Sequence, residues 1–402
     1  MLKPQSYKLK NSIQHYEWGA KGKNAFIPKL LNFKAKKYKP YAELWMGSHP
    51  NASSKIFIGG KEIELAEVIR QYPNEMLGTK TAKRFSNTLP FLFKVLSANE
   101  ALSIQVHPSI KQAIALHKKD PVNYPDSNQK LEIAIALDSL TALVGFKPFN
   151  QIMRALKDYP EIQDFIGESG WTVTEKSKVI KRIFTGLIKK SVSDQVGLED
   201  ALLKLNKRIC KKKKQTEIEK YFLELSRKYK NDIGLLILFF LNLVQLKRGE
   251  AIFTKPEIPH AYLKGNILEC MSNSDNVIRA GLTPKFKDVN TLLKVLNNEL
   301  TAPKIFKGQK KGNSIIYKTN AKEFEIQIFT SNKNEMKFEN QVGPRILLVL
   351  EGAIKFLFID GSKIKSELYS KGESLFLPSI LSNFRITSEK TSRFVLVTVP
   401  CN

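Results

Sequence analysis

The chain has 402 residues, 42% of them hydrophobic and 10% aromatic, so it is long enough for more than one domain and too apolar to be intrinsically disordered. Its 65 basic and 38 acidic residues leave a formal charge of +27, which favours anionic partners, but the lysine clusters carry no interleaved aromatics, so nucleic-acid binding is not expected. The most apolar run, residues 233–246, is shorter than the ~20 residues that span a bilayer and predicts a buried helix, so no membrane association is expected.

The cysteine pattern and the N-terminal residues bear on the cellular compartment of the protein. Cys210, Cys270 and Cys401 form no CxxC pair and no even disulfide framework, which is typical of a reducing environment. Residues 1–5 lack the apolar core of a signal peptide. A cytoplasmic protein is therefore expected.

Residues 1–100 alternate short apolar runs with turn residues, a pattern that predicts β-strands and one short helix over 65–70. The next apolar stretch, residues 102–108, carries the first candidate site. In an extended strand, Gln105 and His107 share one face, while the residues between and before them face a core. For this heptapeptide alone, a core strand with a structural histidine is the favoured interpretation.

A metal site is the alternative interpretation of the same stretch. Glu132 and His260, further along the chain, would complete a set of donors with Gln105 and His107. Such nitrogen and oxygen donors suit zinc and leave room for water or substrate.

Residues 148–246 change to a helical period and predict a helical block between β segments. Apolar residues recur at spacings of one, three and four after an expected cap at Thr174; they include Val179, Ile180, Ile183, Phe184, Leu187 and Ile188, and then Leu198, Leu202, Leu205 and Ile209. The lysine run at 211–214 is predicted to be an exposed loop on this block.

The β pattern resumes near residue 249 with a short internal echo. Residues 249–253 and 372–376 both read as Gly-Glu, a small residue, an aliphatic residue and Phe, and prolines follow each. This pattern predicts two related β-barrels. A histidine follows only the first copy, so the second barrel is predicted to hold no metal.

Residues 258–281 are the stretch densest in ionisable groups. His260 and Tyr262 share a strand face, which puts a phenol beside the candidate metal. Glu269 and Arg279 follow in a segment too apolar for a surface loop. Each has an ordinary structural alternative, such as an ion pair for the arginine, but as a set after such a histidine they indicate an active site.

These stretches resemble the type I phosphomannose isomerases, which are zinc enzymes built on the cupin β-barrel. The matching segments lie, in the family's order, at 18–19, 42–50, 89–96, 102–108, 128–132 and 259–288, and cover most of the β portion. The chain departs from the family at Gln129, where a histidine is usual, at Leu131, where a proline is usual, and at residues 109–111. None of these changes removes a candidate ligand.

The resemblance implies a mainly β fold with an α-helical insertion: two cupin-like (jelly-roll) β-barrels plus a helical domain. The catalytic zinc cupin domain would comprise 1–147 and 247–300, the inserted helical domain 148–246, and the metal-free C-terminal barrel 301–402. It implies one Zn²⁺ per chain, held by Gln105, His107, Glu132 and His260, and a catalytic role for Arg279. Candidates for proton transfer are Lys130, Glu269 and Tyr262, and candidates for substrate contacts are Lys94, Ser103 and Arg279.

The implied reaction interconverts mannose 6-phosphate and fructose 6-phosphate through an enediol, catalysed by a monomer whose partner is a small sugar phosphate. Two alternatives stay open. One is another zinc cupin enzyme, although an amide ligand argues against an iron oxygenase. The other is a barrel that binds sugar phosphates without turning them over.

Overall fold

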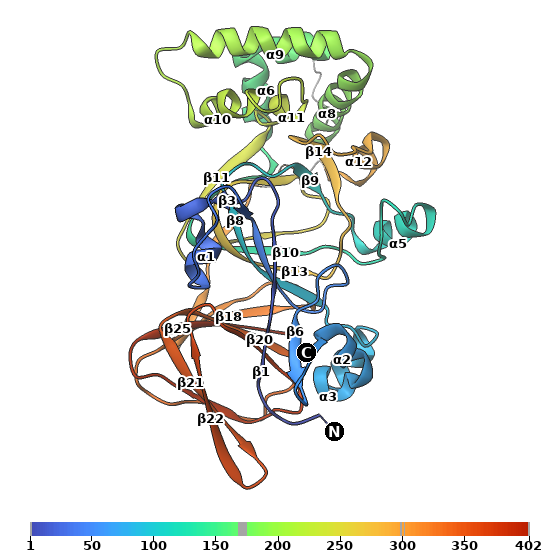
Figure 1. Ribbon diagram of the computed structural model, residues 1–402. Helices are drawn as coiled ribbons and strands as arrows, with labels where there is room; N and C mark the ends of the chain where they lie inside the picture. Colours follow the sequence, from blue (N-terminus) through green and yellow to red (C-terminus); the bar gives the residue numbers. More distant parts are fainter. Residues whose placement is uncertain (1, 168–174, 298–299, 301, 401–402) are drawn as a thin grey trace.

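The computed structural model describes residues 2–167, 175–297, 300 and 302–400, so the expected cap at Thr174 and the thiol of Cys401 lie outside the described residues. Figure 1 shows three regions along one axis: helices at one end, a large sheet in the middle, and the C-terminal sheets at the other end. The predicted fold class, mainly β with a helical insertion, is confirmed.

The central sheet carries the candidate site. Among the described residues its strands lie in the order β15 (Ile305–Lys307), β12 (Glu250–Thr254), β10 (Glu132–Phe146), β13 (His260–Ser272), β8 (Phe91–Ala98), β5 (Glu43–Met46) and β2 (Ser12–Gln14). Three further strands join it: β11 (Leu241–Lys247) beside β10, and β9 (Ile104–Val106) between β13 and β14 (Ile278–Gly281). All eight residues of β8 are buried, which is why this strand reads as a near-continuous apolar run.

The predicted buried helix over 233–246 is wrong in its second half. Only α11 (Gly234–Ile237) is helical, and the chain then enters β11, which pairs antiparallel with β10. A short apolar run does not separate a buried helix from a buried strand by its period. Likewise β15, from the predicted C-terminal barrel, pairs with β12 of the central sheet. Sheet membership therefore differs from the predicted divisions at 246/247 and 300/301, and the domain scheme itself stays a prediction.

The helical block consists of six helices within the described residues: α6 (Phe149–Asp158), α7 (Pro160–Ile166), α8 (Lys176–Ser193), α9 (Gln195–Cys210), α10 (Glu217–Ser226) and α11. The apolar residues predicted at helical spacing on α8 and α9 are all buried in one core. Residues 211–214 are exposed, as predicted, but Lys212 also contacts the fully buried Glu219.

Glu219 links three parts of this block. Its Oε1 accepts a hydrogen bond from the Tyr159 hydroxyl (2.9 Å), and its Oε2 accepts one from the Thr216 amide (2.7 Å) at the start of α10. Burial alone would raise the pKa of Glu219, but Lys212 and these donors outweigh it and hold that pKa below its ordinary value.

Glu219→Gln is therefore expected to lower the stability of the protein by about 1–3 kcal/mol at pH 7, because hydrogen bonds to a charged group are lost. The exposed Lys212 ammonium adds little to this figure. A depressed folded-state pKa means that the stabilisation is present above the unfolded pKa and is lost as the pH falls below about 4.5. Melting temperatures measured from pH 7 to pH 4 should show the gap to wild type narrowing. Glu224→Gln, exposed on the same helix, is the control and should show no gap.

The C-terminal part forms two sheets. One follows the order β1 (Tyr7–Lys8), β23 (Ser374–Leu377), β20 (Arg345–Glu351), β25 (Ser392–Thr398), β18 (Glu325–Ser331), β17 (Ser314–Tyr317) and β16 (Gln309–Lys311); the other follows β19 (Met336–Phe338), β24 (Phe384–Thr387), β21 (Ala353–Asp360) and β22 (Lys363–Ser370). Strand β20 alternates between two cores: Leu347 and Val349 face the second sheet, and Ile346 and Leu348 face the core shared with the central sheet. Strand β20 of the larger sheet is thus buried on both faces.

Both copies of the internal echo run from a turn glycine into a strand. Gly249 and Gly372 have φ of +79° and +88°, which a residue with a side chain rarely adopts; β12 begins one residue after Gly249, and β23 begins two residues after Gly372. That the second barrel binds no metal stays a prediction.

Short elements complete the fold. They are the hairpins β3 (Ala20–Lys21) with β4 (Pro40–Tyr41) and β6 (Lys55–Ile58) with β7 (Lys61–Glu64), the 3-10 turn Gly22–Asn24, and the helices α1 (Phe26–Leu30), α2 (Leu65–Gln71), α3 (Pro73–Leu77), α4 (Thr79–Arg84), α5 (Ile110–Lys119) and α12 (Val289–Val295). Helix α2 confirms the helix predicted over 65–70. Across the described residues, no helix has the length and apolarity needed to cross a membrane.

Candidate active site

Strand β9 lies between β13 and β14, and its pairing brings three candidate side chains into one row. Gln105 stands opposite His260 on one side and opposite Arg279 on the other. Directly opposed residues of antiparallel strands project to the same face. The Gln105, His260 and Arg279 side chains therefore leave the sheet together, and His107 follows two residues after Gln105.

The ligand atoms of His107, Glu132 and His260 lie within 4.8 Å of one another, and all three residues are buried. His107 Nε2 is 3.3 Å from Glu132 Oε1, and His260 Nε2 is 3.2 Å from Glu132 Oε2. Gln105 Nε2 lies 3.5 Å from His260 Nε2. The four residues proposed from the sequence thus meet at one point, contributed by β9, β10, β13 and the loop after β9.

Both imidazoles are oriented by backbone carbonyls. His107 Nδ1 lies 2.8 Å from the Asn276 carbonyl oxygen, and His260 Nδ1 lies 2.9 Å from the Ile258 carbonyl oxygen. A carbonyl only accepts, so each Nδ1 carries the proton and each Nε2 keeps a lone pair. This is the usual arrangement behind a metal-binding histidine.

The polar atoms at this point fit a cation. His107 Nε2 and Glu132 Oε2 are buried and form no hydrogen bond within the described structure, a costly state unless another group completes it. Burial, and then the charge of Lys130, lowers the pKa of His107 to about 4, which keeps the imidazole neutral at pH 7. Burial alone would raise the pKa of Glu132, but Lys130 and His107 outweigh it and hold that pKa well below its ordinary value. A neutral imidazole and an ionised carboxylate are the protonation states that metals bind.

Lys130 lies beside this group. Its ammonium is 3.2 Å from Glu132 Oε1, and the residue is buried. Lys130, a proton-transfer candidate from the sequence, thus lies next to a candidate metal ligand.

A second buried charge cluster adjoins the metal group. The Lys94 ammonium on β8 lies 3.1 Å from Glu269 Oε2 and 3.7 Å from Glu43 Oε2, and the Trp45 indole donates a hydrogen bond to Glu43. Burial alone would lower the pKa of Lys94, but Glu269 and Glu43 outweigh it and raise that pKa above its ordinary value. Burial raises the pKa of Glu269. Lys94 thus forms ion pairs with two carboxylates, and its predicted role as a substrate contact stays a prediction.

Tyr262 and Ser103 are two further candidates from the sequence that lie in this region. The Tyr262 hydroxyl is buried without a hydrogen bond in the described structure, and burial, followed by the charge of Glu269, raises its pKa well above the ordinary value. Ser103 is half-buried, and the preceding Leu102 amide donates to the Tyr262 carbonyl (2.8 Å), which ties this segment to β13.

Arg279 is half-buried, and its guanidinium forms no hydrogen bond or ion pair with any residue that the structure describes. Burial lowers its pKa. The structural alternative considered from the sequence, an ion pair with a carboxylate, is not observed within that part of the chain. A half-buried cation without a counter-ion among the described residues is suited to an anionic ligand.

Sequence reasoning missed three residues. Glu43 anchors Lys94, His49 lies 3.2 Å from Asp275 Oδ1, and Asn276 orients His107 through its carbonyl. Glu43 and His49 fall in the segment at 42–50 that carries the family resemblance, so a signal was present. The role of Asn276 has no sequence signal, because it acts through its backbone.

Comparison of this chain with known proteins identifies a family of similar sequence. Residues 6–149 match the family described as phosphomannose isomerase type I, catalytic domain. A mannose-6-phosphate isomerase from Schizosaccharomyces pombe is 37% identical over 97% of this chain and 98% of the relative, and one from Macaca fascicularis is 36% identical over 91% and 90%. The chain therefore belongs to the type I phosphomannose isomerase family.

Solved structures agree with this assignment. An arginine-to-alanine mutant of phosphomannose isomerase from Salmonella typhimurium has a TM-score of 0.82 and 31% identity, with 98% of this chain and 100% of that chain covered. A zinc-bound mannose 6-phosphate isomerase has a TM-score of 0.82 and 30% identity, again over 98% and 100%.

Proposed function

We propose that this chain is a zinc-dependent aldose–ketose isomerase that interconverts mannose 6-phosphate and fructose 6-phosphate. The observation that carries the proposal is the meeting point of one carboxylate, one amide and two imidazoles that both turn Nε2 toward it; Arg279, in the same row, has no ion pair with any described residue. Gln105, His107, Glu132 and His260 would hold one Zn²⁺. That the protein is a monomer in the cytoplasm stays a prediction.

When bound, zinc supplies positive charge that polarises the sugar oxygens. The chain's own groups then handle the anion and the protons. Arg279 is suited to hold the phosphate or the oxyanion that forms as C2 loses its proton, because its planar fork donates two hydrogen bonds. Ser103, half-buried two residues before Gln105, is a further candidate to hydrogen-bond a sugar oxygen.

Isomerisation moves a proton from C2 to C1 and another between the two oxygens. Burial raises the pKa of the Glu269 carboxyl, which makes this residue a candidate to give and take the proton. Tyr262, with its raised pKa, stays protonated and acts as a donor only. Lys130 faces Glu132 and would stabilise an oxyanion as a point charge.

Purified protein loaded with zinc should convert mannose 6-phosphate to fructose 6-phosphate and should act poorly on free mannose. Its kcat/KM for the phosphate should fall as salt is added, because the +27 chain and Arg279 attract the dianion and salt screens that attraction. A coupled assay at several ionic strengths measures both effects. Equal efficiency with mannose would remove the phosphate anchor. Tight binding of mannose 6-phosphate without conversion would instead establish the sugar-phosphate-binding alternative.

A further inference from the structure

The helical block touches the strand that carries Arg279 at a point where two backbones meet. Gly234 opens α11, and Gly281 closes β14. A Cβ built on Gly281 would lie 2.4 Å from the Gly234 Cα, and one built on Gly234 would lie 2.5 Å from the Leu282 nitrogen. Only glycine allows this approach, so the seam between the block and β14 is fixed at backbone level.

The Asp232 carboxylate binds backbone amides on both sides of this contact between the helical block and β14. Oδ1 accepts hydrogen bonds from the amides of Gly234 and Leu282, both at 2.7 Å, and Oδ2 lies 3.0 Å from the Lys287 ammonium. Leu282 has φ of +54°, which is a strained conformation for a residue with a branched side chain. Such a conformation persists only when its surroundings hold it, and here an amide hydrogen bond and burial of the Leu282 side chain in the helical core do so.

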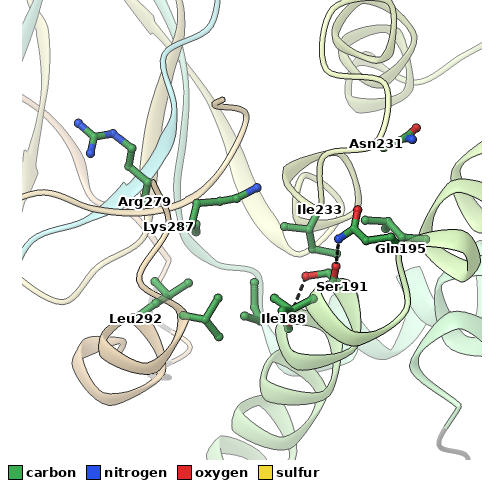
Figure 2. A pocket seen from close by; sticks show the side chains of 12 residues that line it. Ile188, Ser191, Gln195, Asn231, Ile233, Arg279, Lys287 and Leu292 are labelled. Carbon is green, nitrogen blue, oxygen red and sulfur yellow. Dashed lines mark hydrogen bonds between the residues drawn. The ribbon is translucent and has the colours of Figure 1, made fainter. Parts of the chain in front are cut away.

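Strand β14 needs this support. It has four residues, it pairs with β9, and that pairing becomes irregular between Arg279 and Gly281. Figure 2 shows Arg279 and Lys287 on one side of a cavity and Ser191, Gln195 and Asn231 of the helical block on the other. The cavity has a volume of about 110 Å³ and is lined in part by Arg279 of β14. Ile278 and Ala280 pack into the helical core, and the Asp232 carboxylate adds hydrogen bonds that fix the end of the strand.

We propose that Asp232 is a positioning residue for Arg279: its carboxylate fixes the turn at Gly281–Leu282 and so holds the guanidinium opposite Gln105. The inference rests on the proposed function, because it presumes that Arg279 contacts the substrate. By this proposal the helical block contributes to catalysis through Asp232, although Asp232 itself contacts no reacting atom.

A double-mutant cycle tests the coupling. Asp232→Ala should lower kcat/KM for mannose 6-phosphate about tenfold or more, because a displacement of about 1 Å in a positioned group can cost up to about a hundredfold. In an Arg279→Ala background the same change should cost less than about twofold, since there is no guanidinium left to misplace. Asp232→Asn keeps an oxygen for the two amides and should recover part of the activity. Zinc content should be unchanged in every variant.

Glu219→Gln is the matched control, a buried carboxylate whose contacts with Tyr159 and Thr216 lie inside the same helical block. It should lower the melting temperature and have equal effects on kcat/KM in both backgrounds. The inference is overturned if Asp232→Ala lowers only the melting temperature, or if its fold-loss in kcat/KM is the same with and without Arg279. Should Asp232→Ala fail to fold, Asp232→Asn gives the same comparison. Absence of turnover in the unmodified chain would overturn the proposed function instead, and normal turnover in Arg279→Ala would overturn the role of the arginine and the inference with it.

Discussion

Removal of zinc by a chelator should abolish turnover, and added Zn²⁺ should restore it. His107, Glu132 and His260 converge on one buried point, where His107 Nε2 and Glu132 Oε2 form no hydrogen bond with the described residues. Zinc should therefore also stabilise the fold, because a ligand that binds only the native state raises the melting temperature. Metal analysis and thermal melting give readouts that do not depend on activity.

Single substitutions locate the metal. His260→Ala and Glu132→Ala should each hold much less zinc, since the remaining donors form a poorer site. The control is His117→Ala on α5, whose Nδ1 also faces a carbonyl, that of Tyr124 at 2.7 Å, but which lies outside the ligand group. It should retain full zinc content. Full occupancy in both His260→Ala and Glu132→Ala would disprove the site.

The candidate metal ligands could be proposed from the sequence because strand alternation is a local rule. It places Gln105 and His107 on one side, and it does the same for His260 and Tyr262. The sequence does not show that β9 inserts between β13 and β14, because strand pairing joins residues more than 150 positions apart. Donor chemistry and the family resemblance both predicted the same four ligands, but neither gave this strand pairing.

Sequence reasoning missed contacts between residues far apart in the chain and contacts made by backbone groups. Lys94 interrupts an apolar strand, and its two carboxylate partners come from β5 and β13. Strand β11 was predicted as helix because it continues the apolar run that begins at α11, and the period of so short a run does not separate helix from strand. Asp232 gave no signal either, since its partners are backbone amides and the contact depends on two glycines meeting.

Arg279→Ala should lower the turnover of mannose 6-phosphate about a hundredfold. The guanidinium is half-buried, stands opposite Gln105 and has no counter-ion among the described residues, so an anionic substrate would be its first strong partner. Loss of such a donor from a closed site costs on the order of 3 kcal/mol of transition-state stabilisation. Steady-state kinetics and zinc analysis of the same preparations measure the effect, and zinc content should not change, because arginine is not a ligand.

Arg279→Lys separates charge from geometry. Lysine keeps the positive charge but not the planar fork, so it should recover only part of the lost turnover. Arg154→Ala serves as the control, since that side chain is 80% exposed and pairs with Asp158 on the surface of α6. It should leave both turnover and zinc content unchanged. If Arg279→Ala turned over substrate at a near-normal rate but melted at a lower temperature, the guanidinium would be a structural element of the seam beside β14, and the anion would have to be held by other groups.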